Sequence, residues 1–133
     1  MTHATGSCLC GAVTFEVETE FGHFFLCHCS RCQKGTGSAH AANLFGPDGS
    51  LTWRTGADRV TRFQLPGTRH TRAFCATCGA PVPYQAGRLL VVPAGSLDTA
   101  VALKPQAHIC TASRAGWDDD LAALPHMDGL PGA

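Results

Sequence analysis

The sequence predicts an all-β fold, and three observations support that class. Apolar and polar residues alternate along many short segments, as they do from Val13 through Phe15 to Val17, and this period of two is typical of a strand with one buried face. Glycine and proline separate the segments at short intervals. Few stretches have the spacing of an amphipathic helix. Many short strands with such turns are typical of a β-sandwich or barrel.

Length and composition predict one domain. The chain has 133 residues, of which 44% are hydrophobic and 15% are charged, and this is the composition of a folded globule rather than of a disordered chain. No internal repeat or linker divides the sequence. Residues 1–133 are therefore predicted to form a single domain.

The strands follow from the alternation and from the turns between them. They are predicted over residues 13–18, 23–27, 39–45, 50–54, 60–65, 70–74, 81–85, 89–93 and 107–111. The segment 60–65 alternates less cleanly than 13–18 does. Turns are predicted at 46–49, at 66–67 and at Gly95, because glycine and proline there favour a change of chain direction.

Helix has little room in this sequence. One helical turn is predicted over residues 30–35, with Ser30 as its N-cap and Gly35 at its end. A second short helix is predicted over 118–124. The remaining C-terminal residues are predicted to be extended and partly frayed.

The charge balance argues against a nucleic-acid partner. Ten basic and ten acidic residues give a formal net charge of zero, and no run of lysine or arginine could follow a phosphate backbone. Five arginines could gather on one sheet face, although a solvated strand surface is the favoured interpretation: Arg54, Arg59, Arg62, Arg69 and Arg72.

The sequence also predicts a cytoplasmic protein without a membrane anchor. Residues 1–25 contain no basic start followed by the apolar run of a secretory signal. No stretch of about 18 apolar residues could span a membrane. In the reducing cytoplasm closely spaced cysteines more often mean metal or redox chemistry than disulfides, so metal binding is favoured over the disulfide alternative.

Seven of the eight cysteines lie in three tight clusters, which are Cys8-Leu9-Cys10, Cys27-His28-Cys29-Ser30-Arg31-Cys32 and Cys75-Ala76-Thr77-Cys78. Zinc takes four ligands in a tetrahedron, so four thiolates would close one structural site. The other three would leave a fourth position open, which is the usual arrangement of catalytic zinc. The spacing alone leaves open which clusters share a metal.

The clusters differ in local geometry. Cys75 to Gly79 has the pattern of a zinc knuckle, in which a glycine lets the backbone curl past the metal. Cys8 and Cys10 would point to one side of an extended segment. His28 lies between two cysteines of the middle cluster and is not expected to be a ligand, because it would point away from their shared metal. Cys110 has no cysteine neighbour and is predicted to be a small buried apolar residue.

The ordered motifs resemble one known family. The residues that carry the resemblance are Gly6-Ser7-Cys8-Leu9-Cys10-Gly11-Ala12-Val13-Thr14-Phe15, Cys27-His28-Cys29-Ser30-Arg31-Cys32-Gln33, Thr36-Gly37-Ser38, Phe74-Cys75-Ala76-Thr77-Cys78-Gly79, Pro93-Ala94-Gly95-Ser96-Leu97-Asp98, His108-Ile109 and Trp117. They look like the glutathione-dependent formaldehyde-activating enzyme family, which includes the centromere protein V group. The resemblance covers nearly the whole chain.

The resemblance implies a zinc-bearing β-sandwich, sometimes called a β-tent. It implies that one structural zinc is held by Cys8, Cys10, Cys75 and Cys78. It also implies an active zinc at the catalytic triad of Cys27, Cys29 and Cys32. The chain departs from the family pattern at His40, where many members have an aromatic residue, and at Gly116-Trp117, where Pro-Trp is common.

The chemistry that follows is that of a zinc-dependent carbon–sulfur lyase acting on a small thiol adduct. A thiol bound at the open position would have a lowered pKa and would be ready to attack a carbonyl carbon. Glutathione and formaldehyde would then give S-hydroxymethylglutathione. Polar residues near the triad are predicted to hold the glutathione: Arg31, Gln33, Ser38 and His40, with Ser30 and Asn43 as further candidates.

Two other interpretations remain open at this point. The domain could be a non-catalytic, zinc-stabilised thiol carrier or protein-binding module, because no general acid or base with a designated partner can be named. Cys75 and Cys78 could instead form a redox pair, although the knuckle glycine and the second cluster argue against it. A sheet edge in so small a β domain could also mediate homodimerisation.

Overall fold

A computed structural model describes residues 1–132 and confirms the all-β class. Within these described residues a single α-helix, α1 (Ser30–Thr36), interrupts the strands. The first of three sheets has the strand order β1 (Thr2–Ser7), β2 (Thr14–Thr19), β5 (Ser50–Thr55). The second has the order β11 (Ala107–Ile109), β3 (His23–Cys27), β4 (Ala41–Pro47), β10 (Leu89–Pro93), β9 (Tyr84–Ala86). The third has the order β6 (Val60–Gln64), β7 (Thr71–Cys75), β8 (Pro81–Val82). The predicted domain spans residues 1–133, and residue 133 lies outside the described residues.

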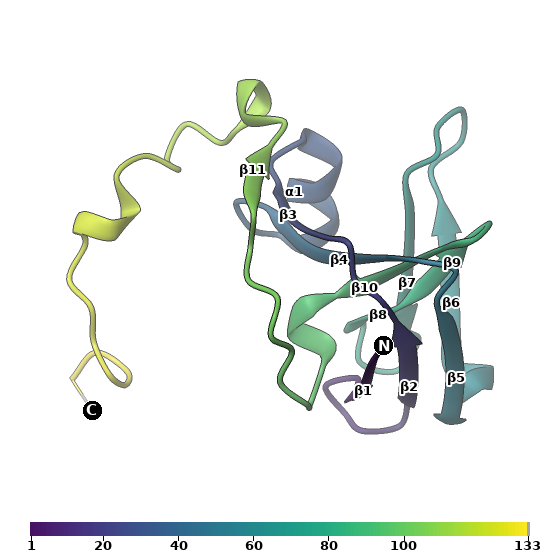
Figure 1. The fold of residues 1–133 in the computed structure, drawn as a ribbon. Helices are drawn as coiled ribbons and strands as arrows, with labels where there is room; N and C mark the ends of the chain where they lie inside the picture. Colours follow the sequence, from purple (N-terminus) through teal and green to yellow (C-terminus); the bar gives the residue numbers. More distant parts are fainter. Residues whose placement is uncertain (133) are drawn as a thin grey trace.

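Strands β4 and β10 of the second sheet lie crosswise to β2 and β5 of the first sheet and to β6 of the third (Figure 1). Every strand pair is antiparallel except β11 with β3, which run parallel. Short 3-10 turns complete the chain at Ala57–Arg59, Ala94–Ser96, Thr111–Ser113 and Leu121–Ala123.

The predicted strands are confirmed in outline, with two informative differences. The ranges 23–27 and 89–93 coincide with β3 and β10. The predicted strand over 81–85 is divided into β8 and β9 at Pro83, since proline has no backbone N–H to give to a sheet. Strand β1 was not predicted, because its sequence has no large apolar residue to alternate with its polar ones.

The main core fills the space between the first and second sheets. Its buried members come from five strands: Ala4, Phe15, Val17, Phe24, Leu44, Leu90 and Val92. The Phe15 ring meets Trp53 edge to face, with 6.1 Å between ring centroids. Burial of each such side chain contributes about 1.5–3 kcal/mol. The alternating residues of β2 therefore fix which face of the first sheet turns inward.

A second, smaller core joins the third sheet to the turn between β1 and β2. Its buried residues are Cys8, Val13, Ala73, Cys75 and Val82. Two cysteines thus belong to the packing as well as to a cluster of thiols, and the cluster sits where the first and third sheets meet.

Gly6 on β1 gives a direct test of the main core. It lies opposite Phe15 in the strand register, and a Cβ added there would come within 2.3 Å of both the Phe15 ring and the Ser96 carbonyl oxygen. The carbonyl belongs to the backbone and cannot move aside. We expect Gly6→Ala to lower the free energy of unfolding by roughly 2–3 kcal/mol, measured by urea denaturation.

The matched control for this substitution is Gly22→Ala. Nothing lies within 4 Å of a Cβ built at Gly22, so its free energy of unfolding should change by less than about 1 kcal/mol. Equal stability of the two variants would contradict the proposed packing of β1.

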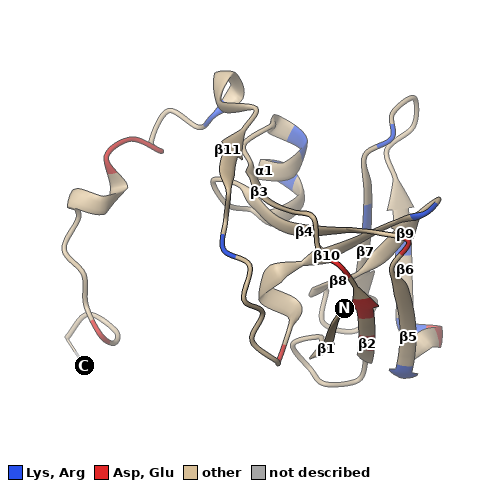
Figure 2. Ribbon diagram, in the orientation of Figure 1, with Lys and Arg blue, Asp and Glu red and all other residues tan. Residues whose placement is uncertain are grey.

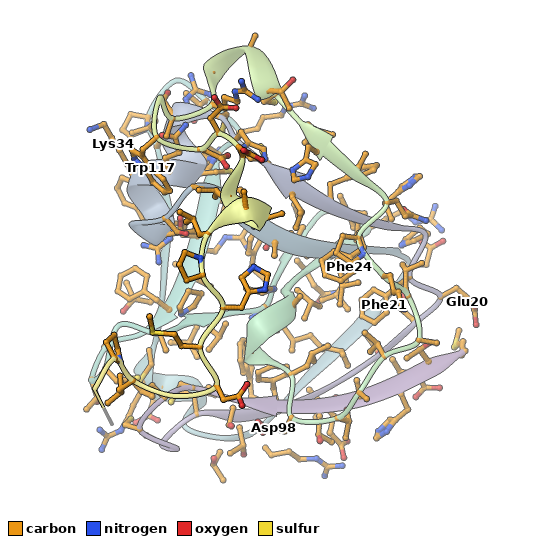
Figure 3. All side chains as sticks on the ribbon, turned by 90° about the vertical axis from the view of Figure 1, so that its left-hand side faces the viewer. Glu20, Phe21, Phe24, Lys34, Asp98 and Trp117 are labelled. Carbon is orange, nitrogen blue, oxygen red and sulfur yellow. The ribbon has the colours of Figure 1, made fainter. Side chains whose placement is uncertain are left out.

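The chain leaves the sheets after β11 and runs along one side of the body (Figure 1). This C-terminal segment exposes several large apolar side chains. Among them are Trp117, which is 63% exposed (Figure 3), and Leu130, which is 77% exposed. The helix predicted over 118–124 is reduced to the 3-10 turn at Leu121–Ala123. Among residues 1–132 no helix has the length and apolarity needed to cross a membrane.

Candidate metal centres and the adjoining cavity

Four cysteines from two distant turns converge in the structure. Cys8 and Cys10 lie in the turn between β1 and β2. Cys75 ends β7, and Cys78 lies in the turn between β7 and β8. Their Sγ atoms all lie within 4.8 Å of one another. We refer to these four residues as the four-sulfur group.

The two turns of the four-sulfur group are built alike. The N–H of Cys8 donates to the Val13 carbonyl and the N–H of Gly11 to the Cys8 carbonyl. In the second turn Cys75 donates to the Ala80 carbonyl and Gly79 to the Cys75 carbonyl. The glycine of each turn has a positive φ, 82° at Gly11 and 75° at Gly79, which a side chain would strain. Both turns therefore carry a pair of thiols past one point in space.

The spacing of the sulfurs fits a tetrahedral zinc ion. Zinc with Zn–S bonds of ~2.3 Å separates its sulfur ligands by about 3.8 Å. The Sγ of Cys10 lies 3.7 Å from that of Cys8 and 3.9 Å from that of Cys75. A disulfide would need about 2.05 Å. All eight cysteines are free thiols, so the geometry favours a metal over the disulfide alternative.

The backbone around the four-sulfur group favours ionised sulfur. Backbone hydrogen bonds from Ala80 and Cys10 lower the pKa of Cys78 to about 6. The pKa of Cys10 is raised to about 11, since the backbone hydrogen bond from Ala12 that lowers it is outweighed by burial and by the neighbouring thiols. Four sulfurs this close cannot all be ionised at once unless a cation balances their negative charge.

Cys27, Cys29 and Cys32 form the second group, and their Sγ atoms also lie within 4.8 Å of one another. We keep the name triad for these three residues. Cys27 ends β3, Cys29 precedes α1, and Cys32 lies within α1. The triad has three sulfurs and no fourth cysteine, as its sequence predicts.

Helix α1 is capped differently from the prediction. The N-cap is Cys29, whose Sγ accepts a hydrogen bond of 3.3 Å from the Cys32 N–H, so the assignment of Ser30 as N-cap is wrong. The helix ends at Thr36 with Gly37 in the left-handed conformation, at φ 67°, rather than at Gly35. One triad residue, Cys29, thus caps the helix that contains another, Cys32.

The three thiols of the triad differ in acidity. Burial raises the pKa of Cys32 and of Cys27 above the ordinary value. Burial also acts to raise the pKa of Cys29, but the backbone N–H of Cys32 and the neighbouring thiols outweigh it and the pKa of Cys29 is lowered. The N-cap position therefore favours the thiolate at Cys29.

A cavity of about 290 Å³ adjoins the triad, and Cys27 and Cys32 line it. Most of its wall is apolar, from β4, the third sheet and their neighbours: Ala41, Ala42, Phe45, Ala73, Pro81, Val82, Pro93 and Ile109. Its polar lining residues are Thr36, Asn43, Arg69, His70, Thr71, Arg72 and Tyr84. A small molecule in this cavity would have two triad sulfurs within its reach.

The four residues predicted to hold glutathione lie outside the lining of this cavity. The Gln33 amide donates to the carbonyls of His28 and Ser113, at 2.7 and 2.9 Å, and so ties α1 to the chain after β11. The ring of His40 packs 5.2 Å from that of His28. Ser38 follows the end of α1, and Arg31 is exposed on it. Their assignment stays a prediction; Asn43, the further candidate, does line the cavity.

Histidine side chains form a cluster beside the triad. His28 is 3% exposed, and its Nε2 lies 2.8 Å from Nδ1 of His108. Its Nδ1 lies 3.0 Å from Asp118 Oδ2, in an orientation that makes no hydrogen bond. Sequence reasoning missed His108 and Asp118 as neighbours of the triad, because 80 positions separate His28 from His108. The cluster holds the segment after β11 against β3.

Cys110 does not have the role predicted from its isolation in the sequence. The residue is exposed rather than buried, and its φ of 58° begins the 3-10 turn at Thr111–Ser113. Its thiol belongs to neither the four-sulfur group nor the triad. The prediction of burial was wrong because it rested on the average behaviour of free cysteine rather than on a local pattern.

The comparisons with known proteins agree on one family. The family model for glutathione-dependent formaldehyde-activating enzymes matches residues 3–113. A curated protein of Halomonas elongata whose name carries that description is 37% identical over 84 aligned positions, covering 56% of this chain and 51% of that protein, so the chain spans about half the length of that relative. The crystal structure of a Rhodobacter sphaeroides protein is similar with a TM-score of 0.58 and 27% identity, over 78% of this chain and 98% of that chain.

Proposed function

Because the chain belongs to the glutathione-dependent formaldehyde-activating enzyme family, we propose that it is a zinc-dependent enzyme of the carbon–sulfur lyase type. It would join a small thiol, such as glutathione, to an aldehyde, such as formaldehyde. The observation that carries the proposal is the cavity of about 290 Å³ whose wall includes Cys27 and Cys32.

The two groups of cysteines have separate roles in this proposal. The four-sulfur group would hold a structural zinc, because four thiols complete a tetrahedron and two of them lie in a buried core. The triad would hold a second zinc with one position left for substrate. When bound there, zinc supplies positive charge that lowers the pKa of a coordinated thiol.

The reaction itself requires little from the protein beyond positioning. The substrate sulfur attacks the carbonyl carbon, a carbon–sulfur bond forms, and the proton of the thiol ends on the former carbonyl oxygen to give a hydroxymethyl thioether. The apolar walls around Phe45, Val82 and Ile109 exclude water and hold the two reactants together. Cys27 and Cys32 fix the position of the sulfur end of the substrate.

A reducing compartment suits this chemistry, and we place the protein in the cytoplasm. The eight free cysteines and a thiol co-substrate support that location. Homodimerisation through a sheet edge stays a prediction.

The proposal predicts a measurable acceleration over the uncatalysed reaction. With zinc-loaded protein, formation of S-hydroxymethylglutathione from glutathione and formaldehyde, followed by NMR exchange, should be at least about tenfold faster than the spontaneous rate. Protein stripped of metal by a chelator serves as the control and should give the spontaneous rate. Zinc-loaded protein that binds thiols without acceleration would overturn the enzymatic proposal and favour the carrier interpretation.

A further inference from the structure

The cavity beside the triad has a strongly uneven distribution of charge. Arg69, His70 and Arg72 line it, and among its described lining residues there is no aspartate or glutamate. Burial is the main cause that lowers the pKa of His70. The nearby positive charges of Arg31 on α1 and of Arg72 lower it further. In Figure 2 the basic residues of α1 and of the β6–β7 end of the molecule are blue, with no acidic ribbon between them. We call Arg31, Arg69, His70 and Arg72 the cationic rim.

The guanidinium groups of the cationic rim have no anionic partner within residues 1–132. The ion pairs of the structure that involve arginine join Arg54 to Glu16 and Arg88 to Asp48, both away from the rim. Neither Arg69 nor Arg72 donates a side-chain hydrogen bond to another described residue. Two guanidinium groups at one small cavity repel each other, and an anionic ligand between them would relieve that repulsion.

Arg72 is held in position rather than free to swing. Its Cδ lies so near Gly35 of α1 that a Cβ added there would come within 2.8 Å, and its guanidinium carbon lies 5.5 Å from the centre of the Phe74 ring. Its side chain is half-buried between the helix and that ring. A planar guanidinium fixed in this way can bind a carboxylate with two parallel hydrogen bonds at little further cost in entropy.

The volume and the apolar residues of the cavity limit the size and polarity of its ligand. The volume of about 290 Å³ lies just below the roughly 300–1,000 Å³ typical of ligand sites, so the ligand must be small. Apolar residues such as Phe45, Val82 and Ile109 would lose contact with water when an apolar group covers them. An ammonium group inside the cavity would find no carboxylate and would be repelled by the rim.

We propose, on the basis of the proposed function, that the substrate of this site is a small thiol with a carboxylate and an otherwise apolar body. Arg72 and Arg69 bind the carboxylate while the sulfur lies at the triad. Glutathione fits the site through a carboxylate only, and its ammonium group contributes nothing to binding.

The test measures binding with ligands that cannot react. Isothermal titration calorimetry on the zinc-loaded protein compares 3-(methylthio)propionate, 2-(methylthio)ethylamine and methyl propyl sulfide, which are anionic, cationic and neutral thioethers of similar size. We expect the carboxylate to bind at least about tenfold more tightly than the amine. Arg72→Gln should weaken binding of the carboxylate by about tenfold or more and leave the neutral thioether unchanged.

Two variants control for charge and for folding. Lys104→Gln removes one positive charge at an exposed residue outside the cavity lining and should not alter carboxylate binding. Arg69→Gln changes an exposed residue of the β6–β7 turn, where misfolding is not expected, and should weaken the carboxylate severalfold. Equal affinity for the amine and the carboxylate, or a loss in Lys104→Gln as large as in Arg72→Gln, would overturn the inference.

The experiments distinguish failure of the proposed ligand class from failure of the proposed reaction. Tight, Arg72-dependent carboxylate binding by protein that does not accelerate the formaldehyde reaction would support the ligand class and refute the reaction. Acceleration with cysteamine as fast as with 3-mercaptopropionate would support the reaction and refute the ligand class.

Discussion

Replacing Cys75 with serine should remove the structural zinc that we propose for the four-sulfur group and unfold most of the molecule. The side chain is 0% exposed, belongs to the smaller core and lies 3.9 Å from Cys10 in the four-sulfur group. Structural zinc is worth ~10–16 kcal/mol in small peptides, whereas a domain of this size has a net stability of roughly 5–15 kcal/mol. We expect bound zinc to fall by about one equivalent, measured by inductively coupled plasma mass spectrometry, and the cooperative thermal transition to be lost.

Cys110→Ser is the matched control for the Cys75 variant. Its thiol is exposed and belongs to neither cysteine group, so zinc content and thermal stability should stay those of the parent. A Cys75→Ser protein that retains all of its zinc and its melting temperature would show that the four-sulfur group has no structural metal.

Replacing Cys29 with serine should abolish the thiol chemistry and leave the fold intact. Serine is a good N-cap residue, and its Oγ can accept the Cys32 N–H bond that Sγ of Cys29 accepts now. The triad, however, would be reduced to two thiols, too few for a stable zinc site. We expect activity to fall by at least about 100-fold, with the unfolding free energy changed by less than about 1 kcal/mol.

The readouts for Cys29→Ser are the rate of the formaldehyde reaction, zinc content and urea denaturation on one preparation. Zinc should fall by about one equivalent while the four-sulfur group stays filled. The same Cys110→Ser protein controls for loss of a thiol in general. Turnover by the Cys29 variant at the rate of the parent would exclude the triad from the reaction.

Much of the fold could be predicted from the sequence because the strands carry their own pattern. Val13, Phe15 and Val17 alternate with polar residues, and all three are buried in the structure. Strand β1 could not be predicted because its burial depends on other parts of the chain. Ala4 is buried in the main core, and Gly6 is buried beneath the Phe15 ring and the Ser96 carbonyl, although neither residue is strongly apolar. Pattern reasoning finds residues that drive burial and misses those that are buried by others.

The candidate site likewise contains residues that the sequence predicts and residues that it does not. The seven clustered cysteines are visible in the sequence because metal spacing is local within each cluster, and the structure brings them into the two groups that the resemblance implies. The sequence alone favours a solvated surface for Arg69 and Arg72, together with Arg54. The structure separates them, since Arg54 pairs with Glu16 while Arg69 and Arg72 line the cavity. Which side of a hairpin faces another sheet is a tertiary property that no local pattern contains.

The two cysteine groups differ in how much of the chain each needs. The triad takes its sulfurs from residues 27–32, whereas the four-sulfur group joins Cys10 to Cys75 across 65 positions. Closing the longer loop costs about 2 kcal/mol more in chain entropy than closing a loop of five residues. A nascent chain presents the triad as a complete ligand set well before Cys78 has been synthesised. The zinc that we propose for the triad could thus bind while the chain is still unfolded, whereas the zinc proposed for the four-sulfur group could find all four sulfurs only after distant strands have met.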